Sequence, residues 1–149
     1  MRLLYLLDTD IASDDLRRSS ALLEARVNDG LLHQTVALSL LTRAELCFGQ
    51  AGMAADDRRR SLIDHLLLQL PSLPWTAGAA DPDGALQDTN QRDGTLTGEI
   101  DTQIAAHALA EGLTLVPHNT RHFDLVPGLK VTDWMSEPPA RARPKRKRS

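Results

Sequence analysis

The chain has 149 residues, of which 42% are hydrophobic and 25% charged, with a formal net charge of −3. This length suits one domain with a single core, and no apolar stretch approaches the roughly 18 residues of a membrane-spanning helix. The single cysteine, Cys47, excludes an internal disulfide and a cysteine-based zinc site, and it suits a reducing cytoplasm.

The first half of the chain alternates between strand and helix patterns. The continuous apolar run Leu3–Leu7 predicts a strand buried on both faces. Leucines near helical spacing predict a helix over residues 13–28, and Gly30 is expected to stop it. Val36–Leu38 predicts a second short strand, after which Thr42 opens another helix that ends at the glycines that follow.

The middle of the chain combines a clear helix with a segment that is hard to assign. Residues 58–70 have leucines at helical spacing and predict an amphipathic helix. Leu73–Trp75 contains a proline and is expected at a sheet edge or in a connection. Residues 77–94 are expected to lack an unbroken helix, because Pro82 and Gly84 interrupt the pattern.

The last third returns to the same alternation. Residues 101–111 predict a helix, Leu113–Val116 a buried strand and Lys130–Trp134 a short final strand. Buried strands that alternate with helices favour an α/β fold with a mainly parallel sheet. We expect one domain over residues 1–136, followed by a basic and disordered tail over residues 137–149.

Charge is distributed unevenly between that domain and the tail. Six of the 17 basic residues fall in the last nine positions, so residues 1–140 carry 11 basic and 20 acidic residues, a net charge of −9. Such a body is poorly suited to hold nucleic acid by charge alone. An acidic domain can bind nucleic acid more readily if some of its acids converge on a divalent cation.

Polar residues gather where the strands are expected to end. Ligands of open parallel sheets bind at the carboxyl ends of the strands. Carboxylates brought together there repel one another unless a cation compensates them, and oxygen ligands without cysteine select Mg²⁺ or Mn²⁺. One or two such ions ionise a water and stabilise charge on a phosphate, which is the chemistry of a nuclease. The residues concerned are Asp8, Asp10, Glu45, Asp101, Asn119, His122 and Asp124.

Each main candidate also has a structural explanation that involves no chemistry. The alternatives are a strand-ending turn for Asp8, a capping box with Thr42 for Glu45, a helix N-cap for Asp101, a turn for Asn119 and a surface or packing position for His122.

Four segments, in order and at the right spacing, resemble the motifs of PIN domains, and in particular those of the VapC toxins of bacterial toxin–antitoxin pairs. The resemblance runs from about residue 3 to residue 134, with Val126–Leu129 similar to the turn before the closing strand. The segments are Leu6–Asp10, Leu41–Gly49, Gly98–Ala108 and Asn119–Phe123.

The resemblance implies a three-layer α/β/α fold and an Mg²⁺- or Mn²⁺-dependent endoribonuclease that cleaves RNA with a metal-activated water. Asp8, Glu45 and Asp101 would be the acidic metal-site residues, with Asn119 completing the site. It also implies a homodimer that a small VapB-like antitoxin inhibits. The single cysteine and the lack of a long apolar stretch lead us to expect a cytoplasmic protein that is not bound to a membrane.

The chain departs from the family pattern in its fourth motif and at its end. The family often has an acid where Asn119 or His122 stands, so Asn119 would ligate through its carbonyl oxygen or hold a water, His122 would hydrogen-bond a phosphate, and one-metal chemistry is credible. The basic tail is either a solvated end or a tether that concentrates RNA through phosphate contacts.

Two other functions are compatible with the pattern. The first is a catalytically silent PIN-like module that binds RNA or an antitoxin without cutting. The second is a phosphoacceptor signalling domain, which is disfavoured because none of the three lysines, Lys130, Lys145 and Lys147, follows a suitable strand.

Overall fold

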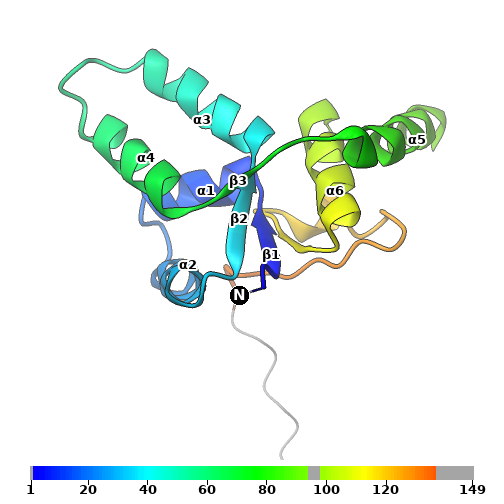
Figure 1. Ribbon diagram of the computed structural model, residues 1–149, viewed down its shortest axis with the longest axis horizontal. Coiled ribbons are helices and arrows are strands. Elements are labelled where there is room, and N and C mark those ends of the chain that lie inside the picture. The colour runs from blue at the N-terminus through cyan, green and yellow to red at the C-terminus, as the bar shows by residue number, and fades with distance from the viewer. Residues whose placement is uncertain (1, 94–97, 137–149) are drawn as a thin grey trace, which may run out of the picture.

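A four-stranded parallel sheet lies at the centre of the fold, in the strand order β3-β2-β1-β4 (Figure 1). The computed structural model describes residues 2–93 and 98–136. In the register of the sheet, Leu6 of the central strand faces Ala37 on one side and Leu115 on the other. The strands are β1 (Tyr5–Leu7), β2 (Val36–Ser39), β3 (Ser72–Leu73) and β4 (Thr114–Val116).

Helices cover both faces of the sheet and make three layers. Because successive strand residues point to opposite faces, Leu7 packs in one core with α1, α2 and α4, whereas Leu6 packs in a second core with α6. Figure 1 shows the same division, with α5 lying against α6. The predicted α/β/α architecture is therefore confirmed. The helices are α1 (Thr9–Leu16), α2 (Ala21–His33), α3 (Leu40–Ala51), α4 (Arg58–Gln69), α5 (Ala77–Asp93), α6 (Glu99–Glu111) and the short 3₁₀ helix η1 (Thr120–His122).

The helix expected over residues 13–28 is wrong in its bounds. Two helices lie here, separated near Arg18, which has a φ of 53°. The second helix continues through Gly30 and ends at Gln34, which has a φ of 56°. Gly30 is needed for close packing, since a Cβ atom there would lie 2.2 Å from Val36 Cγ2. The glycine thus marks a contact between α2 and β2 and does not stop the helix.

The interruption expected at residues 77–94 is also wrong. The continuous helix α5 spans Ala77–Asp93 and contains Pro82. Hydrogen bonds tie it to the start of α6, as Gln87 Nε2 donates to the Glu99 carbonyl at 3.2 Å and Asn90 Nδ2 donates to Thr102 Oγ1 at 2.9 Å. Packing along α6 therefore outweighs the cost of one proline.

The expected final strand is reduced to a single bridge. Val131 pairs with Leu115 in parallel fashion, and Thr132 N donates to the Leu115 carbonyl at 3.0 Å. Beyond it, Trp134 packs edge-on against Tyr5 at a ring-centroid distance of 4.9 Å. The basic tail lies outside the described residues, so its boundary at residue 136 stays a prediction. None of the helices in the described part of the chain is long and apolar enough to cross a bilayer.

Candidate active site

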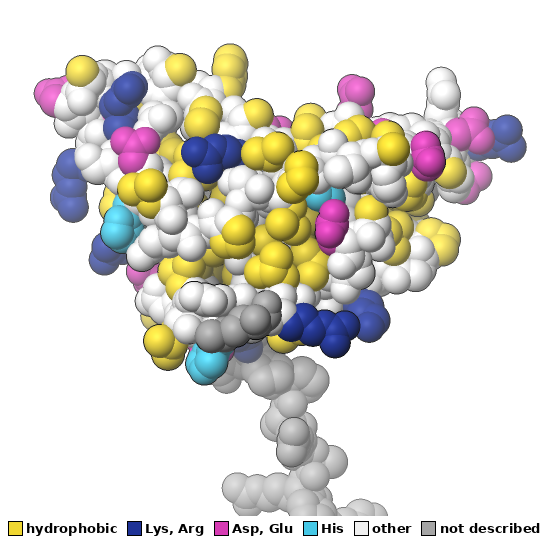
Figure 2. All heavy atoms as spheres, viewed as in Figure 1, with side chains coloured by type: hydrophobic (Ala, Val, Ile, Leu, Met, Phe, Trp, Pro, Cys, Tyr) yellow, Lys and Arg dark blue, Asp and Glu magenta, His cyan; other side chains and the backbone are white. Residues whose placement is uncertain are grey.

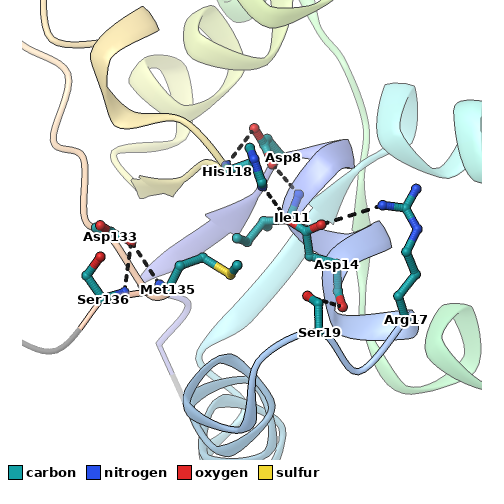
Figure 3. Close-up of polar contacts among 9 residues, drawn as sticks. All are labelled: Asp8, Ile11, Asp14, Arg17, Ser19, His118, Asp133, Met135 and Ser136. Carbon is teal, nitrogen blue, oxygen red and sulfur yellow. Dashed lines mark hydrogen bonds and ion pairs between the residues drawn. The ribbon is translucent and has the colours of Figure 1, made fainter.

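Asp8 occupies the junction between the central strand and α1. Its Oδ1 accepts a hydrogen bond from Ile11 N at 2.7 Å, and its Oδ2 accepts one from His118 N at 3.3 Å (Figure 3). The residue is 4% exposed, and burial raises the pKa of its carboxyl to about 7 against the opposing effect of these two bonds. The charges of Asp10 and Asp101 raise this pKa further. Asp8 is therefore a helix cap, and it also keeps a carboxylate that is costly to ionise.

Asp101 faces the same acids from α6. It is the third residue of that helix, and the cap is Gly98, so the expectation that Asp101 is the N-cap is wrong. Burial raises the pKa of Asp101, and the charges of Asp10 and Glu45 add to this effect. The groups that repel the Asp101 carboxylate thus come from α1 and α3.

Glu45 lies in the second turn of α3 and is half-buried. The capping box with Thr42 is wrong, because Ser39 caps the helix and its Oγ accepts from Leu41 N at 3.1 Å. Thr42 is fully buried, and its Oγ1 accepts a hydrogen bond from Thr9 Oγ1 at 3.1 Å. Glu45 therefore has no part in starting its helix.

The segment after β4 adds Asn119 and His122 to this edge. Asn119 caps η1, where its Oδ1 accepts from Arg121 N at 3.1 Å, so its interpretation as a turn residue holds locally. Its Nδ2 lies 3.4 Å from Nε2 of His122, and both residues are exposed. The charge of His122 lowers the pKa of Asp101, which places the imidazole within electrostatic reach of the acids. Asp124 is exposed.

A histidine–aspartate pair lies beside Asp8 and was missed from the sequence. Nδ1 of His118 makes a hydrogen bond and ion pair with the carboxylate of Asp14, which also pairs with Arg17 Nη1 at 3.6 Å (Figure 3). The Asp14 contact raises the pKa of His118, with smaller contributions from Asp10 and Asp8. One sequence signal could have identified His118, namely its position just after the strand β4, where ligand-binding residues of parallel sheets are expected.

The donor chemistry of this edge fits a hard divalent cation. Asp8, Asp10, Glu45 and Asp101 offer only carboxylate oxygens, which Mg²⁺ and Mn²⁺ prefer. Burial, and to a lesser extent the neighbouring acids, raise the pKa values of Asp8 and Asp101, so a bound cation would favour their ionised forms. Among residues 2–93 and 98–136, no three histidine, cysteine or acidic side chains are arranged so that they could hold a metal ion as they stand. Binding an ion would therefore require these side chains to converge.

A groove of about 240 Å³ opens beside the acids, between α1, α3 and α4. Its lining includes Thr9 and Glu45 from the acidic edge, together with Arg17 and Arg59. Leu46 and Ile63 line its apolar wall. The groove therefore gives an extended ligand access to Glu45.

The chain is similar to known proteins over most of its length. A family model described as "PIN domain" matches residues 5–129. The tRNA(fMet)-specific endonuclease VapC of Shigella flexneri is 31% identical over 130 residues, which cover 87% of this chain and 97% of the relative. Ribonuclease VapC2 of Haemophilus influenzae is 32% identical, with coverage of 88% and 98%.

Solved structures agree with the sequence relatives. The DNA-bound VapBC structure from Salmonella typhimurium superposes with a TM-score of 0.80 at 28% identity, covering 89% of this chain and 98% of that one. The chain therefore belongs to the PIN-domain family, among the VapC ribonucleases.

Proposed function

We propose that the protein is the toxin of a VapBC-type pair, an Mg²⁺- or Mn²⁺-dependent endoribonuclease that hydrolyses RNA phosphodiester bonds in the cytoplasm. The observation that carries this proposal is the pair of carboxyls, Asp8 and Asp101, whose pKa values are raised at the carboxyl edge of the sheet. A divalent cation bound between these two carboxylates would offset the repulsion between their negative charges. The names of the relatives supply the substrate class, RNA.

Each residue has a distinct part in the proposed reaction. When bound, the metal would supply the charge that activates a water and stabilises the reacting phosphate. Asp8 and Asp101 would hold the principal ion, and Asp8 is already oriented by the backbone N–H groups of Ile11 and His118. Glu45 would ligate the metal or orient the water, and Asn119 would complete the site.

Two protein partners belong to the proposal, one supported by the comparisons and one by the surface of the protein. Relatives occur in VapBC complexes, so we propose a small VapB-like antitoxin whose extended segment enters the groove beside Glu45. We also propose a homodimer. Figure 2 shows hydrophobic side chains gathered along the middle of one face, between the arm made by α3 and α4 and the arm made by α5, where a second protein surface would exclude water.

The test is cleavage of structured RNA, including initiator tRNA, with Mg²⁺, Mn²⁺ or EDTA. Wild-type protein is expected to cut only with metal, and Asp8→Asn and Asp101→Asn are each expected to lower the rate by about 10²-fold or more, since removing one charge-stabilising group typically costs this much. Mn²⁺ should also raise the Tm of the wild type, because a ligand that binds only the folded state stabilises it.

A matched control is Asp57→Asn, which alters another helix-capping aspartate that lies on the exposed start of α4. This variant should cut RNA at the wild-type rate. Mn²⁺-dependent stabilisation without cleavage of any RNA would favour the silent binding module instead. Cleavage that survives EDTA or both site substitutions would overturn the proposal.

A further inference from the structure

A buried histidine–serine contact joins the two helices that carry Glu45 and Asp101. Nδ1 of His107, on α6, lies 2.8 Å from Oγ of Ser39, the residue that ends β2 and caps α3. Both residues are 0% exposed, and they are 68 positions apart in sequence. The contact is therefore a long-range link inside the core.

The hydroxyl of Ser39 makes two contacts at once. Its Oγ accepts from Leu41 N at 3.1 Å and also hydrogen-bonds Nδ1 of His107, where the tautomer of the imidazole sets which group donates. Burial lowers the pKa of His107, which keeps the ring neutral, although the Glu111 carboxylate and the Pro74 carbonyl oppose that shift.

Stability alone explains the pair poorly. Nε2 of His107 is buried and makes no hydrogen bond of good geometry among the described residues, although the Pro74 carbonyl acts on the ring and Glu111 Oε1 lies 4.0 Å away. A buried polar group left unsatisfied costs free energy, and an apolar side chain of the same shape would avoid that cost. The pair therefore stabilises this part of the core less than apolar side chains of the same shape would.

The position of the contact relates it to the acids. Ser39 precedes Glu45 by six residues, and His107 follows Asp101 by six. At the helical rise of 1.5 Å per residue, each acid lies about 9 Å along its helix from the contact. Because a helix moves largely as a rigid rod, a change in the Ser39–His107 contact alters the separation of Glu45 and Asp101.

We propose that Ser39 and His107 form a clamp that sets the spacing between Glu45 and Asp101, and so the affinity of the site for a divalent cation. His107 is a positioning residue, since it acts through Asp101 and touches neither metal nor RNA. The inference rests on the proposed function, because it assigns the clamp a role in the same acidic site.

The test compares Mn²⁺ affinity, measured by titration calorimetry on the full chain, with the Tm of the metal-free protein. Ser39→Ala and His107→Leu should each weaken Mn²⁺ binding about 10-fold, the lower end of the effect of removing groups that orient metal ligands. Combining them should weaken it little further, since either change already breaks the contact. His107→Asn, whose side-chain amide can either donate to Ser39 or accept from it, should bind Mn²⁺ within about threefold of the wild type while its smaller side chain lowers the Tm.

Ser20→Ala is the matched control, because Ser20 caps α2 in the same manner, accepting from Leu23 N at 3.1 Å. It should lower the Tm by less than Ser39→Ala, because Ser20 makes one capping hydrogen bond and Ser39 makes two hydrogen bonds, and it should leave Mn²⁺ affinity unchanged. Equal Mn²⁺ affinity in the wild type, Ser39→Ala and His107→Leu would overturn the clamp alone. A wild type that binds no Mn²⁺ would overturn the proposed function, and the clamp with it.

Discussion

Asp8 and Asp57 cap helices in the same way but lie in opposite electrostatic surroundings. Asp8 accepts from Ile11 N at 2.7 Å at the start of α1, and Asp57 accepts from Arg59 N at 2.9 Å at the start of α4. The Arg59 guanidinium also contacts Asp57 at 2.6 Å and lowers its pKa to about 2, whereas burial raises that of Asp8 to about 7.

The difference separates a structural cap from a functional one. Asp57 is fully explained by its helix and by Arg59. Asp8 performs the same capping task at a cost of burial that the backbone N–H groups of Ile11 and His118 offset only in part, and the charges of Asp10 and Asp101 increase that cost. Uncompensated acids of this kind are frequent at functional sites. The partner that compensates Asp8 is therefore expected to come from outside the chain.

The largest change in the pH dependence of the free energy of unfolding is expected from Asp8→Asn in the absence of metal. Asparagine caps helices as well as aspartate does. A carboxyl whose pKa is raised by folding stabilises the protein below its unfolded pKa of 3.8, and this contribution is lost as the pH rises through about 7. Urea unfolding in EDTA should therefore show the wild type losing up to about 4 kcal/mol relative to Asp8→Asn between pH 4 and pH 8.

Asp57→Asn is expected to change the stability at neutral pH in the opposite direction to Asp8→Asn. The lowered pKa of Asp57 gives a contribution that is present above pH 3.8 and is lost as the pH falls through about 2. This variant should thus be less stable than the wild type at neutral pH. If both variants were stabilised at pH 8, the contrast between the two caps would be wrong.

A smaller effect is expected at the His118–Asp14 pair. Asp14→Asn removes the main cause of the raised pKa of His118, so the imidazole should titrate closer to 6.5. A raised histidine pKa gives stability that is full below 6.5 and is lost as the pH rises through the folded value. The variant should be destabilised by about 1 kcal/mol at pH 6, a modest effect because solvent screens this half-exposed ring, and by less at pH 9, where the imidazole is neutral.

The measurement for this pair is an NMR titration of the His118 ring protons, with urea unfolding at both pH values. His33→Gln is a control, since His33 and Asp29 form an exposed pair at 3.3 Å on α2, away from His118 in the sequence. Its substitution should leave the titration of His118 unchanged. An unshifted His118 in Asp14→Asn would show that the pair does not form in solution.

The smallest effect is expected from Arg59→Ala at the exposed cap. The pKa of Asp57 should return toward 3.8, as seen by its carboxyl chemical shift, because Arg59 is the main cause of the lowering. The Tm should fall only slightly, and 0.5 M NaCl should remove most of the difference from the wild type, since salt screens surface charges. A Tm difference that persists in high salt would mean that Arg59 stabilises the protein by packing.

The sequence predicted the elements whose signal is local and missed those decided by distant contacts. Leu3–Leu7 and Leu113–Val116 are apolar runs, and both contain strands of the sheet. Gly30 was misassigned because its reason is Val36 Cγ2, a neighbour across α2 and β2 that no helix rule describes. Pro82 was misassigned because packing against α6 decides the helix there.

In the candidate site too, features with a local sequence signal were predicted and features that depend on distant contacts were not. Asp8, Glu45 and Asp101 were predicted to share one edge, since parallel strands end together, and their charges do act on one another in the structure. The helix caps near Glu45 and Asp101 were predicted wrongly, because α3 begins earlier, at the cap Ser39, and α6 begins earlier, at the cap Gly98. The His118–Asp14 pair depends on how two side chains turn, which strand and helix patterns do not encode.

The place of β1 in the middle of the sheet has a consequence for the order in which the protein is made. Asp8 is synthesised 110 residues before His118, its hydrogen-bond donor, and β1 lacks one neighbour until β4 has been made. The chain must close a loop of this length before the contacts between β1 and β4 can form. While those residues are being translated, the nascent chain carries an exposed strand edge and no assembled acidic centre, so the nuclease site cannot exist before β4 joins the sheet.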